Sequence, residues 1–120
     1  MRILPLLTLG LALSAGAAQA QLVQFCNGRI SLVNVWLDPR SVSDARRPWL
    51  YSGSFTNGTG ASINAVLSFT GPAGTISQAN ARAISMPNGS VTQTPLVQWP
   101  KSMAQPSLGT VAAGVRVACP

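Results

Sequence analysis

The chain has 120 residues, eight lysine and arginine side chains against two carboxylates, and a net charge of +6. It contains no histidine and only two cysteines. This composition argues against most metal sites, against hydrolysis by paired carboxylates and against any triad built on histidine.

The first twenty residues have the layout of a secretory signal peptide. A positive charge at Arg2 precedes an apolar run over Ile3–Leu13, and small residues lead to Ala18-Gln19-Ala20, an A-x-A cleavage site. Cleavage after Ala20 would leave residues 21–120 as a single domain. No later apolar stretch is long enough for a transmembrane helix. The sequence therefore predicts an exported protein, periplasmic or extracellular.

The two cysteines lie near opposite ends of the segment 21–120, at Cys26 and Cys119. In an exported protein an even pair of cysteines predicts a disulfide. Such a bridge would close nearly the whole domain and hold its first and last strands side by side, with the two Cα atoms within about 7 Å. Two separate buried thiols are the alternative.

The remaining sequence is typical of an all-β protein, because it is rich in turn residues and poor in the lysine and glutamate that cover helix surfaces. In chain order we expect strands over 21–25, 29–37, 49–56, 63–69, 90–97 and 110–119. Residues 75–86 fit a strand better than a short helix, and 40–48 form a polar loop with one helical turn at 43–47. Trp36 lies inside an apolar strand, which predicts a place in the core.

One pair of strands forms the clearest local pattern. Trp49–Thr56 alternates, Asn57-Gly58-Thr59-Gly60 turns the chain, and Ile63–Phe69 alternates again, which predicts a β-hairpin. The stretch Tyr51–Phe69 resembles a hairpin of small exported bacterial immunoglobulin-like domains of the FxLYD kind. The resemblance implies a fold and no catalytic residue.

Together these elements predict an all-β fold: an antiparallel, immunoglobulin-like β-sandwich of about seven short strands, preceded by a cleavable signal peptide. The spacing of the cysteines differs from that of the inter-sheet bridge in antibody domains. We therefore infer the architecture and not that family.

Few side chains are suited to catalysis. Asp38 and Asp44 flank one loop and could share a calcium ion, but turn capping and pairing with neighbouring arginines is the simpler interpretation. Lys101-Ser102 could form a hydrolytic pair, although neighbours in a loop rarely adopt that geometry. We predict a protein that is not an enzyme and needs no metal or cofactor.

Two asparagines match the acceptor pattern for N-glycosylation, in Asn57-Gly58-Thr59 and Asn88-Gly89-Ser90. Asn-Gly is also the dipeptide that tight turns require. A turn is the interpretation that we favour at both positions.

The side chains with binding potential are aromatic and cationic. Arg46, Arg47 and Trp49 form one cluster, and Trp99 and Lys101 form another, each beside a proline. If the fold brings them together, they form a basic aromatic patch suited to an acidic protein face or an anionic glycan. Packing of both tryptophans over the core is the alternative.

The leading hypothesis is a non-enzymatic exported module that binds another protein or a glycan, or serves as a structural subunit. The alternative is a small secreted enzyme inhibitor or effector that acts through an extended loop, Pro95–Pro106. Nucleic-acid binding is not expected, because there is no basic stripe with interleaved aromatics. A pilin-like subunit would need a longer donor strand than Gln21–Phe25.

Overall fold

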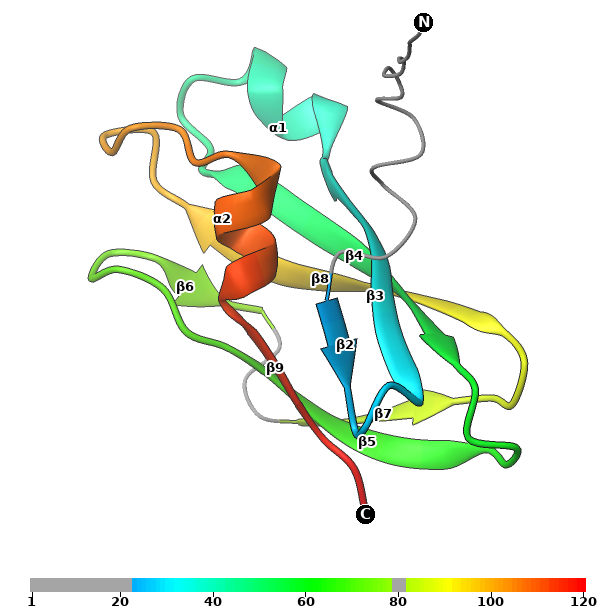
Figure 1. The fold of residues 1–120 in the computed structure, drawn as a ribbon. Coiled ribbons are helices and arrows are strands. Elements are labelled where there is room, and N and C mark those ends of the chain that lie inside the picture. The colour runs from blue at the N-terminus through cyan, green and yellow to red at the C-terminus, as the bar shows by residue number, and fades with distance from the viewer. Residues whose placement is uncertain (1–22, 79–81) are drawn as a thin grey trace, which may run out of the picture.

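The computed structural model describes residues 23–78 and 82–120, which form two antiparallel sheets packed face to face (Figure 1). The five-stranded sheet has the order β2 (Val23–Phe25), β3 (Ile30–Leu37), β4 (Trp49–Asn57), β8 (Val91–Trp99) and β6 (Ile76–Ser77). The three-stranded sheet has the order β7 (Arg82–Met86), β5 (Ile63–Phe69) and β9 (Val115–Ala118). The predicted all-β architecture of two antiparallel sheets is confirmed. The expected signal peptide, Met1–Ala20, lies outside the described residues.

Two short helices accompany the sheets, α1 (Pro39–Ser43) and α2 (Leu108–Ala113). In the part of the chain that the structure describes, no helix has the length and apolarity to span a membrane. The helical turn expected over 43–47 lies earlier, because Asp38 provides the N-cap: its carboxylate accepts a hydrogen bond from the Arg40 backbone N–H at 3.0 Å. Pro39 then occupies the first turn, where its missing N–H costs nothing.

The core lies between the two sheets and is built from inward-facing strand residues and two residues of α2. Its buried members from the larger sheet are Ile30, Leu32, Val35, Tyr51, Phe55, Leu96, Val97 and Trp99. Those from the other side are Ala65, Leu67, Phe69, Met86, Val111, Ala112 and Val115. The register shifts once in β3, at Val33, and once in β8, at Leu96. Each β-bulge moves the following residues to the opposite face.

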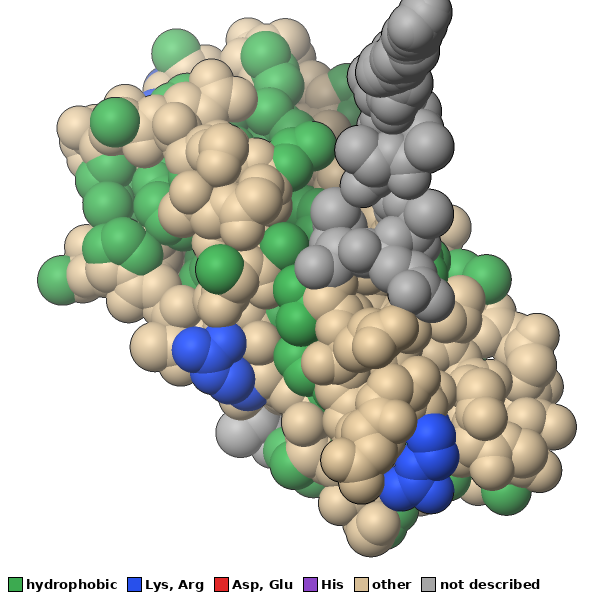
Figure 2. Space-filling model, in the orientation of Figure 1, with side chains coloured by type: hydrophobic (Ala, Val, Ile, Leu, Met, Phe, Trp, Pro, Cys, Tyr) green, Lys and Arg blue, Asp and Glu red, His purple; other side chains and the backbone are tan. Residues whose placement is uncertain are grey.

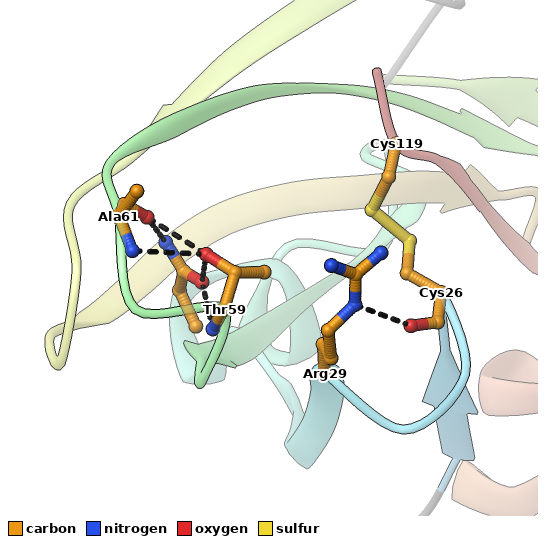
Figure 3. Close-up of a disulfide and its surroundings, with 6 residues drawn as sticks. Cys26, Arg29, Thr59, Ala61 and Cys119 are labelled. Atoms are coloured by element: carbon orange, nitrogen blue, oxygen red, sulfur yellow. Dashed lines mark hydrogen bonds between the residues drawn. A yellow bond between two sulfur atoms is a disulfide. The ribbon is translucent and has the colours of Figure 1, made fainter.

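The expected hairpin between β4 and β5 is wrong. β4 pairs with β3 and β8, whereas β5 pairs with β7 and β9, so residues 58–62 cross from one sheet to the other. The Asn57 side chain holds this crossing: its Nδ2 donates to the carbonyl oxygens of Ala61 and Met86, both at 2.8 Å. Its Oδ1 accepts from the N–H and the hydroxyl of Thr59. Figure 3 shows Thr59 and Ala61 in this turn.

The same contacts bear on the two glycosylation patterns. Asn57 is 3% exposed and its amide nitrogen already donates two hydrogen bonds, so attachment of a glycan there is incompatible with this fold. Asn88 lies on the exposed turn between β7 and β8, where Gly89 has a φ of 72°. The turn interpretation therefore holds at Asn88, whereas Asn57 begins a connection between sheets.

The strand expected over 110–119 is also wrong in its first half. Residues of that segment form α2, whose N-cap Ser107 accepts a hydrogen bond from the Thr110 N–H at 3.1 Å. Gly114 ends the helix, and a Cβ atom there would lie 2.6 Å from Cε1 of Phe69. Only glycine therefore allows the backbone to pass this close to the Phe69 ring before β9 begins. Alternation of valine and alanine is compatible with a helix as well as with a strand.

The disulfide between Cys26 and Cys119 is confirmed, with Cα atoms 6.1 Å apart (Figure 3). In the strand order of the described residues, β2 belongs to the five-stranded sheet and β9 to the three-stranded sheet, so the bridge joins the two sheets instead of two strands of one ladder. Nε of Arg29 donates to the carbonyl oxygen of Cys26 at 3.2 Å and closes the turn beside the bridge. The disulfide thus links the segment after β2 to the segment after β9 and holds the two sheets together at this point.

Candidate ligand-binding groove

The floor of the candidate site is the outer face of the five-stranded sheet, near the end that carries α1. Leu50 is paired with Gln98, and Gln98 with Ile76. Residues directly opposite one another in antiparallel strands share a face. The adjacent residues Tyr51 and Trp99 are buried in the core, so this row points outward.

Two connections form the walls of the site. The α1–β4 connection contributes Arg46, Arg47 and Pro48, and the segment after β8 contributes Pro100 and Lys101. Both lie at the end of the molecule that is uppermost in Figure 1. Between them are two hollows of about 170 Å³ and 290 Å³, which share Arg47, Pro48 and Gln98. We call these hollows together the basic groove.

The hydroxyl of Ser41 fixes α1 above this floor. It donates to the carbonyl oxygen of Asp38 at 2.6 Å and accepts from the N–H of Leu50 at 3.1 Å. The N–H of Asp38 donates to the carbonyl oxygen of Leu50 at 2.8 Å. These bonds hold α1 beside the first residues of β4, where Ser41 and Leu50 line the hollow of about 170 Å³.

Lys101 holds the two walls together. Its Nζ donates to the carbonyl oxygens of Ser41, Val42 and Asp44, the last at 2.7 Å. These carbonyls lie at the C-terminal end of α1, where a cation is favoured, and that of Asp44 also accepts from the Arg47 backbone N–H at 3.1 Å. The same Nζ lies 6.0 Å from the centre of the Trp49 ring. The sequence predicted that Lys101 belongs to this region. It did not predict that the ammonium group would stabilise the fold by binding backbone carbonyls of α1.

The arginines of the groove differ in how far they are neutralised. Arg40 pairs with Asp38 at 3.1 Å, and Arg46 with Asp44 at 3.6 Å. Hydrogen bonds from Arg40 hold the pKa of Asp38 below its ordinary value, and the charge of Arg47 adds to this effect. Pairing of both aspartates with neighbouring arginines agrees with the simpler interpretation of the sequence.

Among the three arginines that line the groove, Arg47 differs because no carboxylate of the described residues is paired with it. Its side chain makes no hydrogen bond or ion pair with the described residues, and it borders both hollows. By contrast, Figure 2 shows the face with α2 and β9, where the cationic side chains in full view stand apart from one another. At the α1 end, four cations (Arg40, Arg46, Arg47 and Lys101) lie together with the two aspartates.

The two tryptophans of the expected patch have different environments. Trp99 is 4% exposed and belongs to the core, which is the alternative that the sequence left open. Trp49, its partner across β4 and β8, is partly buried beneath Lys101. The structure therefore brings Arg46, Arg47 and Lys101 to one groove, with Trp49 at its edge and Trp99 beneath the surface.

The core position expected for Trp36 is wrong, and the bulge in β3 is the reason. Beyond Val33 the alternation is shifted, so Val35 points into the core and Trp36 points to the outer face, opposite Ser52. Trp36 is partly buried there. A bulge leaves no clear signal in a strand whose residues are almost all apolar.

The extended loop expected over Pro95–Pro106 is shorter than predicted. Residues 95–99 belong to β8, and the loop begins at Pro100. Pro95 is tolerated in a strand because β6 pairs only with Val97 and Gln98, which leaves β8 without a described neighbour on that side at Pro95. The shorter loop is anchored to α1 by Lys101, which weakens the basis for an inhibitor that inserts a long loop.

Two polar atoms beneath the groove are buried without a well-formed hydrogen bond among the described residues: the Tyr51 hydroxyl and Nε1 of Trp99. Burial raises the pKa of Tyr51, and the nearby side chain of Gln105 offsets part of this rise. The neutral phenol is therefore the form that the folded protein favours.

Tyr51 is the single tyrosine of the chain, so tyrosinate absorbance reports on it alone. We expect the folded protein to resist ionisation above the ordinary pKa of 10.0, and its stability to fall as pH rises from 10.0 through the raised value. The sign follows because the unfolded chain loses this proton first. Titration at or below pH 10.0 with an unchanged circular dichroism spectrum would contradict the burial of Tyr51.

The fold and the groove define a small, disulfide-bonded β-sandwich with a basic groove at one end. Within the described ranges, no group of three or more His, Cys, Asp or Glu side chains could hold a metal ion. Comparisons with protein-family models, curated proteins and solved structures find no significant match to this chain. The geometry of the groove is therefore the feature of the molecule that bears on its function.

Proposed function

We propose that the protein is a non-enzymatic, exported β-sandwich module of immunoglobulin-like type that binds an anionic glycan in the basic groove. The signal-peptide pattern over Met1–Ala20 and the Cys26–Cys119 bridge support export to the periplasm or beyond, where disulfides persist. The engagement of Asp38 by Arg40 and of Lys101 by backbone carbonyls supports binding over acid–base catalysis.

The unpaired guanidinium of Arg47 is the observation that carries this proposal. A guanidinium presents a planar fork of donors that matches a carboxylate with two parallel hydrogen bonds. Arg47 stands between the two hollows, and Gln98 on the floor adds an amide that can bond to hydroxyl groups. This combination suits a sugar that carries a carboxylate.

The size of the hollows favours a glycan over a protein face. Pockets for drug-sized ligands measure about 300–1,000 Å³, and the two hollows are about 170 and 290 Å³. Each is therefore too small for a drug-sized ligand and suits a small unit of a longer one. A protein partner of ordinary affinity would instead cover about 800 Å² on each side of a broad interface.

The test is binding of the segment 21–120 to a polyuronic acid and to a neutral polysaccharide, before and after Arg47→Gln. We expect binding to the polyuronic acid alone and a loss of about tenfold or more in the variant, because a hydrogen bond to a charged group contributes about 1.5–3 kcal/mol. Added salt should weaken the wild-type interaction.

Arg29→Gln is the matched control, because it removes the same charge at the opposite end of β3. It should retain nearly all of the affinity. Equal losses in the two variants would indicate attraction to net charge instead of a site, and full affinity in Arg47→Gln would overturn the proposal.

A further inference from the structure

The outer face of the five-stranded sheet continues beyond the basic groove. Trp36 is paired with Ser52, and Ser52 with Pro95, so these three form one row across β3, β4 and β8. Leu50, on the floor of the groove, is two residues from Ser52 along β4. The two rows are therefore about 7 Å apart on the same face.

A further row follows in the same direction. Asn34 is paired with Ser54, and Ser54 with Gln93. Asn34 and Gln93 are exposed, and Trp36 is partly buried. No residue of these two rows carries a charge. We call the two rows together the Trp36 face.

We propose that the Trp36 face is a second part of the same binding site, and that the ligand is a chain of sugars with an acidic unit at Arg47 and a following unit stacked on Trp36. This inference rests on the proposed function and specifies the ligand further. The chain would run along the strands of the outer face, from the α1 end toward Asn34 and Gln93.

The chemistry of the Trp36 face matches a carbohydrate. The faces of a sugar ring present C–H groups to an indole, and its edges present hydroxyl groups that pair with amides. Asn34 and Gln93 supply amides at exposed positions, and Ser52, beside the indole, is small and partly exposed. A nucleic acid would need cations along this path, and these rows have none.

The position of the face also favours a ligand over another strand of protein. Pro95 interrupts the donors of β8 along the stretch that β6 does not cover, which disfavours addition of a strand at this edge. On its inner side the sheet is covered by the three-stranded sheet and α2 (Figure 1). Among the described residues, the α1–β4 connection and the segment Pro100–Ser102 wall the outer face at the basic groove.

The experiment measures the affinity of the segment 21–120 for a monomeric uronic acid and for its oligomers of defined length. We expect affinity to rise with length in the wild type. Trp36→Ala should lower the affinity for oligomers by about three- to tenfold, the range for loss of an aromatic contact, and leave that for the monomer unchanged. Arg47→Gln should weaken both.

Gln93→Ala provides a second variant at an exposed position, where folding is not at risk. It should also reduce the affinity for oligomers and spare the monomer. If affinity is independent of length, or if Trp36→Ala and Gln93→Ala retain full affinity for oligomers, the inference about the Trp36 face is wrong while the groove at Arg47 stands.

Two other outcomes separate the alternatives. Normal oligomer binding by Arg47→Gln would overturn the proposed function itself. If sedimentation shows that the wild type is a dimer and that Trp36→Ala is a monomer, the Trp36 face is an interface between two copies of this chain, and the inference fails.

Discussion

Replacement of Cys26 and Cys119 by alanine should lower the free energy of unfolding by about 4–5 kcal/mol, the loss expected for a loop of about 100 residues. The two positions are 93 residues apart, so the bridge restricts almost the entire unfolded chain. Single domains are stable by only about 5–15 kcal/mol. The variant should therefore unfold at much lower urea concentration.

Equilibrium unfolding in urea, followed by circular dichroism, measures this difference. Wild-type protein held reduced should match the double alanine variant, because both lack the same constraint. A variant within about 1 kcal/mol of the oxidised wild type would contradict the prediction. It would mean that contacts between the two sheets, and not the link from β2 to β9, hold the terminal strands in place.

The disulfide and the class of fold could be predicted because their signals are local or nearly unique. Only one pairing is available to two cysteines, and the two alternating stretches remain strands in the structure, with Tyr51, Phe55, Ala65 and Leu67 buried. What the pattern could not specify was the partner of each strand. Alternation states which face is apolar, not which sheet the strand joins.

Two errors have a common physical origin in irregular backbone. A single extra residue at Val33 moved Trp36 from the core to the outer face. A second irregularity, the glycine-dependent approach of Gly114 to Phe69, allowed a helix where alternation predicted a strand. Both depend on contacts between distant segments, which no window of sequence contains.

The candidate groove was partly predictable. Arg46 and Arg47 stand beside a proline in a polar loop, which is where exposed cations are expected, and the structure brings that loop to Lys101. The sequence does not indicate that the ammonium group of Lys101 would be hydrogen-bonded to backbone carbonyl oxygens at the end of α1. It also does not indicate that Trp99 would be buried. Those outcomes follow from the helix at Pro39–Ser43 and from the length of β8.

Asn57→Asp should be among the most damaging single substitutions in the protein, although it changes only one atom. In the wild type Nδ2 donates to the carbonyl oxygens of Ala61 and Met86, at 2.8 Å each. A carboxylate would place an oxygen against both acceptors, and the position is 3% exposed. We expect a loss of about 3–5 kcal/mol, comparable with other uncompensated buried charges.

The pH dependence distinguishes this cause from a general loss of packing. Repulsion and burial raise the folded-state pKa of the introduced carboxyl above its unfolded value of about 3.9, so the folded variant binds the proton more tightly than the unfolded chain. Its stability should therefore increase as pH falls through the raised pKa, because the protonated carboxyl again offers a donor.

Asn88→Asp, the same change on the exposed turn between β7 and β8, should stay within about 0.5 kcal/mol of the wild type. Urea unfolding of both variants at neutral and mildly acidic pH makes the comparison. An Asn57→Asp protein as stable as Asn88→Asp, or one with no gain on acidification, would show that the crossing between the sheets does not depend on the donors of Asn57.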